Sequence, residues 1–148
     1  MPDPVVLPPF SVSLAGAEDA VRAGLAQAMT CLRPLGLSVD DAGTVELVLA
    51  EVLNNVVEHA LRSTEELTNV EVRGAQSAKG LRLTVIDRGV PMPKGIAPAA
   101  KAPDVDVPIE DLPEGGFGWF MIHSLATEVH YARIGGTNHL TLLLPVGT

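Results

Sequence analysis

The sequence contains a single cysteine, Cys31, so no disulfide can form within the chain. Cys31 lies in an apolar helical pattern, where we expect a small buried hydrophobe rather than a reactive thiol. No stretch is apolar over the length that a membrane-spanning helix needs, and the opening residues, MPDPVVLPPF, lack the basic start and continuous apolar run of a signal peptide. These absences favour a cytoplasmic protein with no membrane partner.

Basic residues are also scarce. Lys and Arg number 10 against 18 Asp and Glu, which gives a net charge of −8. A surface this acidic repels a phosphate backbone, so we expect no direct nucleic-acid partner. The 148 residues suit a chain that buries its own core, and no internal repeat or low-complexity tract divides them. We therefore predict a single domain over residues 1–148.

Regular periodicity is missing between residues 90 and 114. This stretch holds six of the 12 prolines, and five acids against two lysines. Long stretches without internal structure are uncommon in compact domains and usually serve as lids or binding loops. We predict a semi-rigid loop with that role.

Elsewhere the hydrophobic pattern predicts alternating helices and strands. Ser38, followed by Asp41, resembles a capping box at the start of the second helix. The short third helix is predicted to turn Met121, Ile122 and Leu125 inward. The predicted elements are an edge strand at 5–14, helices at 18–32 and from 38 to about 61, strands at 69–74 and 81–87, a helix after 118, and strands at 127–134 and 139–145 around a turn at 135–138. Together they predict an α+β fold, a two-layer sandwich of a mixed or antiparallel sheet with about three helices on one face.

The second predicted helix carries a polar row beside its apolar stripe. Glu51, Asn55 and His59 follow one another at four-residue intervals, which places them along one edge of a helix. Spacing alone favours a solvated flank. Asparagine is a poor helix former, however, so its presence here points to a site. An amide oxygen suits Mg²⁺, whereas zinc requires more His or Cys than this edge offers. The stripe consists of Val45, Val48, Leu49, Val52, Leu53, Val56, Val57 and Ala60.

A second motif, VIDRGVP, runs from a predicted strand into Asp87 and Gly89. An Asp–x–Gly turn is common for structural reasons alone. A carboxylate at a strand end can also accept a hydrogen bond from an exocyclic amino group, and a glycine beside it leaves room for a flat ring. The motif is therefore open to both interpretations.

A third motif places Gly115, Gly116 and Gly118 before the short helix. Backbone N–H groups at such a turn can hold phosphate, although a helix-entry turn explains the glycines equally well. The sequence has no Walker motif and no dinucleotide GxGxxG in its strand–helix–strand context. Trp119 follows this turn, and we favour a core position for it over contact with a ligand.

The three motifs together resemble the GHKL ATPase superfamily, specifically the anti-sigma-factor serine/threonine kinases of bacterial partner-switching systems. ELVLAEVLNNVVEHA resembles the family's N box, VIDRGVP its DxGxP box and EGGFGWFMIHSLATEV its Gly-rich box, in the family's order. The resemblance covers most of the chain and implies the family's Bergerat-type ATP-binding fold, which agrees with the sandwich predicted above.

The resemblance also implies roles for residues. Asn55 would hold Mg²⁺ on the ATP phosphates, and Glu51 would be the general base, with His59 supporting the helix edge. Asp87 would bind the adenine amino group, and Gly89 would lie beside the ring. The implied phosphate loop comprises Gly115, Gly116 and Gly118, and the implied ATP lid is the loop at 90–114.

The function implied is a kinase that phosphorylates a STAS-type anti-anti-sigma protein, with ATP and Mg²⁺ as cofactors, a sigma factor as a further partner and a homodimer as the assembly. Glu114 departs from this pattern, since some family kinases carry a basic residue there, and the lid is acidic. The departure favours an alternative, a catalytically silent ATP-binding module that sequesters a protein partner. A sensor histidine kinase and a metal hydrolase using the Glu51 edge rank below both.

Overall fold

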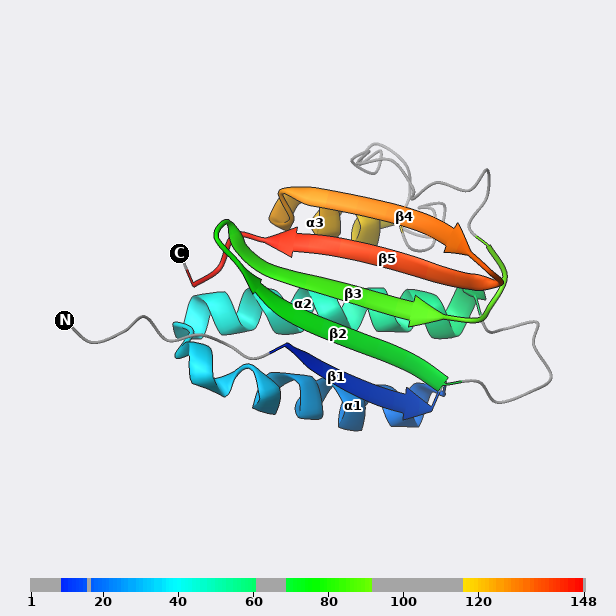
Figure 1. Cartoon of the computed structure of the whole chain (residues 1–148), viewed down its shortest axis with the longest axis horizontal. Helices are drawn as coiled ribbons and strands as arrows, with labels where there is room; N and C mark the ends of the chain where they lie inside the picture. Colours follow the sequence, from blue (N-terminus) through cyan, green and yellow to red (C-terminus); the bar gives the residue numbers. More distant parts are fainter. Residues whose placement is uncertain (1–8, 16, 61–68, 92–115, 148) are drawn as a thin grey trace, which may run out of the picture.

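The computed structural model of the chain describes residues 9–15, 17–60, 69–91 and 116–147. These residues form a five-stranded sheet with the α-helices packed on one face (Figure 1), which confirms the predicted α+β sandwich. The elements are β1 (Phe10–Ala15), α1 (Glu18–Cys31), a 3-10 helix (Arg33–Leu35), α2 (Val39–Asn55), a π-helix (Val56–Ala60), β2 (Asn69–Ser77), β3 (Gly80–Asp87), α3 (Gly116–Leu125), β4 (Glu128–Ile134) and β5 (Thr137–Leu144). No helix in this part of the chain is long and apolar enough to span a membrane.

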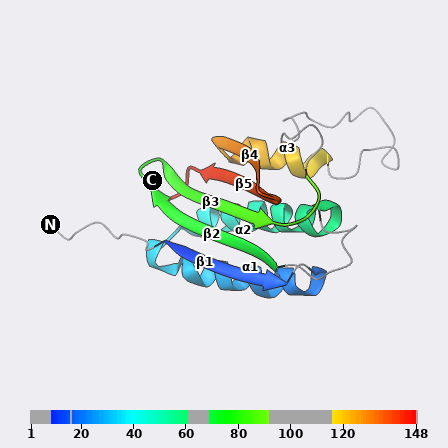
Figure 2. The ribbon, with the colours of Figure 1, turned by 45° about the vertical axis from the view of Figure 1, so that its right-hand side comes forward.

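The strand order is β1-β2-β3-β5-β4, and every pair of neighbours is antiparallel. Figures 1 and 2 show α1 behind β1, α2 behind the middle of the sheet and α3 behind β4 and β5. β1 lies at an edge as predicted, although it begins at Phe10 and the predicted residues 5–8 lie outside the described part. The predicted central strand is also confirmed, because Leu142, Leu143 and Leu144 are all buried.

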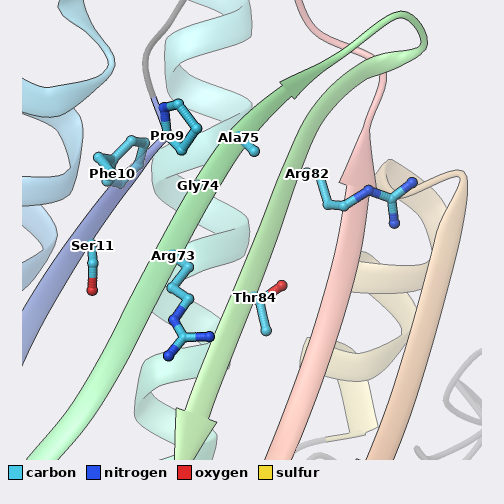
Figure 3. Close-up of a pocket in the computed structure, with 8 residues that line it drawn as sticks. All are labelled: Pro9, Phe10, Ser11, Arg73, Gly74, Ala75, Arg82 and Thr84. Carbon is cyan, nitrogen blue, oxygen red and sulfur yellow. The ribbon is translucent and has the colours of Figure 1, made fainter.

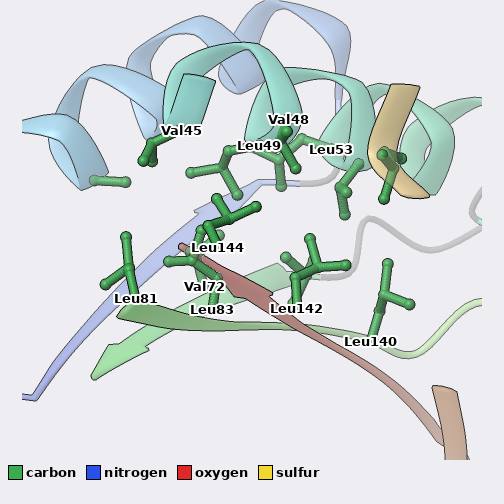
Figure 4. Packing of buried hydrophobic residues seen from close by; sticks show 14 of the residues in the cluster. Val45, Val48, Leu49, Leu53, Val72, Leu81, Leu83, Leu140, Leu142 and Leu144 are labelled. Carbon is green, nitrogen blue, oxygen red and sulfur yellow. The ribbon is translucent and has the colours of Figure 1, made fainter. Parts of the chain in front are cut away.

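The core lies between α2 and the inner face of the sheet (Figure 4). The predicted stripe of α2 points at the strands, with Leu49 and Leu53 at most 1% exposed. Leu83 and Leu142 are opposed residues of β3 and β5, and both are fully buried beneath this stripe. Burying one such side chain contributes roughly 1.5–3 kcal/mol, so this row of contacts supplies much of the stability.

The two ends of α2 differ from each other. The N-terminus forms as predicted, because the Ser38 hydroxyl accepts a hydrogen bond of 3.1 Å from the Asp41 N–H. The C-terminus does not, since the α-helix ends at Asn55 and the next turn, Val56–Ala60, is π-helical. The predicted helix to about residue 61 is therefore confirmed as far as residue 60, although its last turn is π-helical and not α-helical. A π turn pairs each N–H with the carbonyl five residues back, which widens the helix, and such turns frequently occur at functional sites.

The β4–β5 hairpin has a shorter turn than predicted. Gly135 and Gly136 have φ angles of 56° and 83°, the left-handed values that a two-residue hairpin turn requires. Two glycines therefore suffice for the turn, and Thr137 and Asn138, predicted to lie in it, belong to β5. The β2–β3 hairpin is confirmed, and β2 extends to Ser77 instead of ending at residue 74.

The inner face of α3 differs by one position from the prediction. Ile122 is fully buried, and Trp119 and Leu125 pack against the core cluster, whereas Met121 is half-buried outside it. Residues three apart share a helix face, so Trp119, Ile122 and Leu125 form the stripe and Met121 lies beside it. The core position favoured for Trp119 is confirmed. Cys31 is half-buried, less than predicted, because it is the last residue of α1.

Replacing Leu49 by alanine tests the importance of this core. We expect Leu49→Ala to lower the free energy of unfolding by about 2–5 kcal/mol, because it leaves a cavity between α2 and the sheet. The matched control is Leu47→Ala on the same helix, where the side chain is 53% exposed and the change should stay within about 0.5 kcal/mol. Urea denaturation measures both variants, and equal losses would contradict the described orientation of α2.

Candidate functional site

Three polar side chains are buried in the described part of the chain, and they gather at one end of it. Asn55 is 8% exposed, and Asp87 and Asn138 are each 4% exposed. Figures 1 and 2 both place the C-terminal ends of α2 and β3 and the beginning of β5 at this same end. Burying a polar group is costly unless it is hydrogen-bonded, so this grouping marks a candidate site.

Asp87 is the last residue of β3, and its carboxylate closes a tight turn. Its Oδ1 accepts a hydrogen bond of 2.8 Å from the Gly89 N–H and another of 2.9 Å from Asn138 Nδ2. Both hydrogen bonds that the described residues give Asp87 end on Oδ1. The predicted Asp–x–Gly turn is therefore present, and its buried carboxylate is of the type that can accept a hydrogen bond from an amino group.

Asn55 is buried at the last α-helical residue of α2. Its Nδ2 has no hydrogen-bond partner among the described residues, and it is the one buried side-chain nitrogen or oxygen there with none. An unpaired buried amide costs roughly 1–3 kcal/mol, so the position is unfavourable for folding alone. A hydrogen-bond acceptor such as a phosphate oxygen or a water molecule would explain it.

This amide fits the predicted Mg²⁺. Turning the amide group exchanges its oxygen and nitrogen, so the same side chain can face a cation or a phosphate oxygen. No group of three or more His, Cys, Asp or Glu residues capable of holding a metal occurs in the described ranges. Mg²⁺ commonly takes one or two protein ligands beside substrate phosphates, and Asn55 would be one of them.

Glu51 and Gly118 bring α2 and α3 together. A Cβ added to Gly118 would lie 1.9 Å from Glu51 Oε1 and 2.6 Å from its Cδ. The half-buried Glu51 carboxylate thus occupies the space that the missing side chain of Gly118 leaves. The first and third sequence motifs, which lie far apart in the chain, therefore meet at this contact.

Other predicted site residues are described only in part or not at all. Gly116 is the first residue of α3, whereas Gly115, Glu114 and the predicted lid from residue 92 on lie outside the described residues. His59 lies in the π-helix, and its side chain is not described. The α-helical part of the predicted edge thus comprises Glu51 and Asn55, since α2 ends at Asn55.

The sequence interpretation missed Asn138. It faces Asp87 directly across the β3–β5 pair, a relation that the predicted four-residue turn concealed. The signal was the Gly135–Gly136 pair, because a two-residue turn would have placed Asn138 on the inner face of β5.

A groove of about 380 Å³ lies on the outer face of the sheet, with the helices behind it (Figure 3). Its arginines are already paired, Arg73 with Glu71 at 2.8 Å and Arg82 with Glu128 at 3.6 Å. Asp87 points to the opposite face, so we assign the groove no part in the site. Its lining residues are Pro9, Phe10, Ser11, Arg73, Gly74, Ala75, Arg82 and Thr84.

The pKa values of two ionisable groups at this groove, Glu71 and Arg73, are shifted. Hydrogen bonds from Arg73 and Ser11 hold the pKa of Glu71 below its ordinary value of 4.5. The hydrogen bond between Arg73 and Glu71 also raises the pKa of Arg73. A lowered carboxyl pKa contributes stability that is present above pH 4.5 and is lost as the pH falls through the folded-state pKa. The pair is solvent-exposed, so this contribution is small.

Gly118→Ala tests the contact with Glu51. The carboxylate is the end of a flexible side chain and can move away, so we expect the stability to stay within about 1 kcal/mol of the parent while Glu51 is displaced. The control is Gly43→Ala in α2, where an added Cβ meets nothing within 4 Å. Chemical denaturation of both variants measures the cost of moving Glu51 as the difference between them. No difference would contradict the contact.

The sequence of the chain is similar to those of known proteins. Residues 14–144 match the family described as the histidine kinase-like ATPase domain. The chain is 27% identical over 96 residues to the serine-protein kinase RsbW of Bacillus mycoides, and this aligned region covers 64% of this chain and 59% of that protein. RsbW of Bacillus anthracis matches with the same identity and coverage. The match thus spans less than two thirds of these relatives.

Solved structures share the fold. The structure of the RsbU and RsbW domains of Rv1364c from Mycobacterium tuberculosis superposes with a TM-score of 0.64 at 22% identity, covering 94% of this chain and 32% of that one. The histidine kinase domain of the Erythrobacter litoralis EL346 blue-light-activated kinase gives a TM-score of 0.53 at 22% identity, covering 85% and 61%. With the family match extending over most of its length, the chain belongs to the histidine kinase-like ATPase family.

Proposed function

We propose that the protein is an ATP-dependent serine/threonine kinase of the anti-sigma type, which transfers the γ-phosphate of ATP to a serine of a STAS-type anti-anti-sigma protein. The observation that carries the proposal is that three buried polar side chains, Asn55, Asp87 and Asn138, lie at the end of the molecule where α2 and β3 end and β5 begins. The relatives named serine-protein kinase RsbW support the choice of a kinase.

In this proposal each motif has a separate task. Asp87 accepts a hydrogen bond from the adenine amino group, and Gly89 lies beside the ring. Gly116 and Gly118, with Gly115, shape the loop that receives the phosphates at the start of α3.

Asn55 and Glu51 serve the phosphoryl transfer. Asn55 holds Mg²⁺, which when bound neutralises charge on the phosphates. Glu51 takes the proton from the serine hydroxyl as that oxygen attacks the γ-phosphorus, while the bond from the γ-phosphorus to the bridging oxygen breaks and ADP leaves. Phosphoryl transfer depends mainly on positioning and charge neutralisation, so a carboxylate, an amide and a glycine loop suffice as the protein's part. Gly118 contributes by leaving space for the Glu51 carboxylate.

The proposal extends to partners and assembly. It includes a sigma factor as a binding partner, a homodimer, a single domain over residues 1–148 and a cytoplasmic location. The STAS substrate and the sigma factor are proposed from the family resemblance. The aligned region spans only 59% of the RsbW relatives, so their partners are not simply those of this chain.

Glu51→Gln tests the catalytic step. The protein is incubated with ATP labelled on the γ-phosphate, Mg²⁺ and a STAS-type anti-anti-sigma protein from the same organism. We expect label to reach the STAS protein and Glu51→Gln to slow the transfer by about 100-fold or more, the usual contribution of a general base. The control, Glu46→Gln, alters an exposed carboxylate of the same helix and should leave the rate unchanged. Undiminished transfer by Glu51→Gln would exclude this base, and binding of Mg-ATP without any transfer would favour the silent ATP-binding module.

Asn55→Leu separates binding from folding. We expect the free energy of unfolding to stay equal or to rise by about 1 kcal/mol, because the change removes the buried Nδ2 donor that has no partner among the described residues. Affinity for Mg-ATP should fall by about tenfold or more, the loss of one bond to a charged group. The control is Asn54→Leu, which changes the exposed neighbour. Calorimetric titration measures affinity, and unchanged binding by Asn55→Leu would remove Asn55 from the site.

A further inference from the structure

Asn138 makes more hydrogen bonds than its place in a strand requires. Its Nδ2 donates to Asp87 Oδ1 at 2.9 Å, to the Val90 carbonyl at 2.9 Å and more weakly to the Gly89 carbonyl at 3.4 Å. All three acceptors belong to the turn that follows β3. A single buried amide thus holds both the side chain and the backbone of this turn.

The acceptor side of the same amide is also occupied. The Tyr131 hydroxyl and Arg133 Nη1 both donate to Asn138 Oδ1, the latter at 3.0 Å. These contacts hold the amide in one orientation, with Nδ2 directed at Asp87. Because the donors come from β4, the whole β4–β5 hairpin determines where the Asn138 amide points.

Arg133 makes a second contact with the turn. The same Nη1 donates a hydrogen bond of 2.6 Å to the Gly89 carbonyl. Arg133 therefore joins Asn138 and the turn directly, and it does so from the exposed edge strand of the sheet. Its removal would loosen the turn without opening the core.

These contacts bear on which oxygen of Asp87 can receive a ligand. The Gly89 N–H and Asn138 Nδ2 both converge on Oδ1. A carboxylate oxygen that already accepts two hydrogen bonds has little remaining capacity, so an additional donor is directed to Oδ2. The carboxylate is then turned so that one oxygen serves the protein and the other serves the ligand.

We infer that Asn138, oriented by Arg133, is the positioning residue that directs Asp87 Oδ2 to the amino group of adenine, so that the β4–β5 hairpin sets the selectivity for the base. The inference rests on the proposed function, since it takes Asp87 as the adenine ligand. Asn138 does not itself touch the nucleotide in this account. It acts through the orientation of the Asp87 carboxylate and the backbone at Gly89 and Val90.

The test compares the binding of Mg-ATP and Mg-ITP, whose base carries a carbonyl oxygen in place of the amino group. Phosphate and ribose contacts are the same for both, so the ratio of the affinities reports the contacts at the edge of the base that carries the amino group and N1. The variants are Asn138→Ala and Arg133→Met, and Arg82→Met is the control, since Arg82 pairs with Glu128. Calorimetric titration gives each affinity, and circular dichroism checks the folding of each variant.

We expect the parent protein to prefer ATP by about tenfold or more, and this preference to fall to near unity in Asn138→Ala, the loss of one hydrogen bond to a charged group. Arg133→Met should lower the preference for ATP over ITP by about threefold, because it removes the hydrogen bonds that orient Asn138 and the turn but leaves Asn138 in place. Arg82→Met should keep the parent ratio. If Asn138→Ala fails to fold, the ratio in Arg133→Met decides the question.

The outcomes that would contradict the inference about Asn138 differ from those that would contradict the proposed function. A parent protein that binds both nucleotides equally, or neither, would overturn the role of Asp87 and with it the proposed function. A parent that prefers ATP, with variants that keep this preference, would overturn only the inference about Asn138. Equal weakening of ATP and ITP in both variants would also overturn it, because that result indicates general destabilisation rather than positioning.

Discussion

The contact between the apolar stripe of α2 and the inner face of the sheet determines the placement of the remaining elements. Leu49 and Leu53 are buried against the strands, which fixes the rotation of the helix about its axis. Since successive residues on a helix differ by about 100° in direction, this rotation also decides where the polar residues point. Asn55 turns inward at the end of the stripe, and Glu51 lies at its flank against Gly118. The same packing that stabilises the fold therefore presents the polar groups of the site.

The buried polar side chains at this end of the core differ in whether hydrogen bonds offset the cost of their burial. Asp87 and Asn138 satisfy one another across β3 and β5, so this pair is compatible with a stable fold even without a ligand. The Nδ2 group of Asn55 has no such partner among the described residues. A protein that keeps an unpaired buried amide gives up stability there, which is typical of a position retained for binding.

The sheet contributes through its register. Because side chains alternate between the faces of a strand, a shift of one residue in β5 would move Asn138 from Asp87 to the outer surface. The two-residue turn of Gly135 and Gly136 prevents this shift, since both adopt φ angles that other residues rarely reach. A turn remote from the candidate ligand thus sets the geometry of the carboxylate that is proposed to bind it.

Local patterns in the sequence were enough to determine the α+β sandwich, the apolar face of α2, its cap at Ser38 and the turn at Asp87, because each depends on residues a few positions apart. The three motifs also pointed to the family to which the chain belongs. Only the tertiary structure decided the π turn after Asn55, the approach of Glu51 to Gly118 and the pairing of Asp87 with Asn138, which lie 51 positions apart. These contacts join distant segments, and their geometry follows from how the helices and strands pack on one another rather than from the preference of any single stretch.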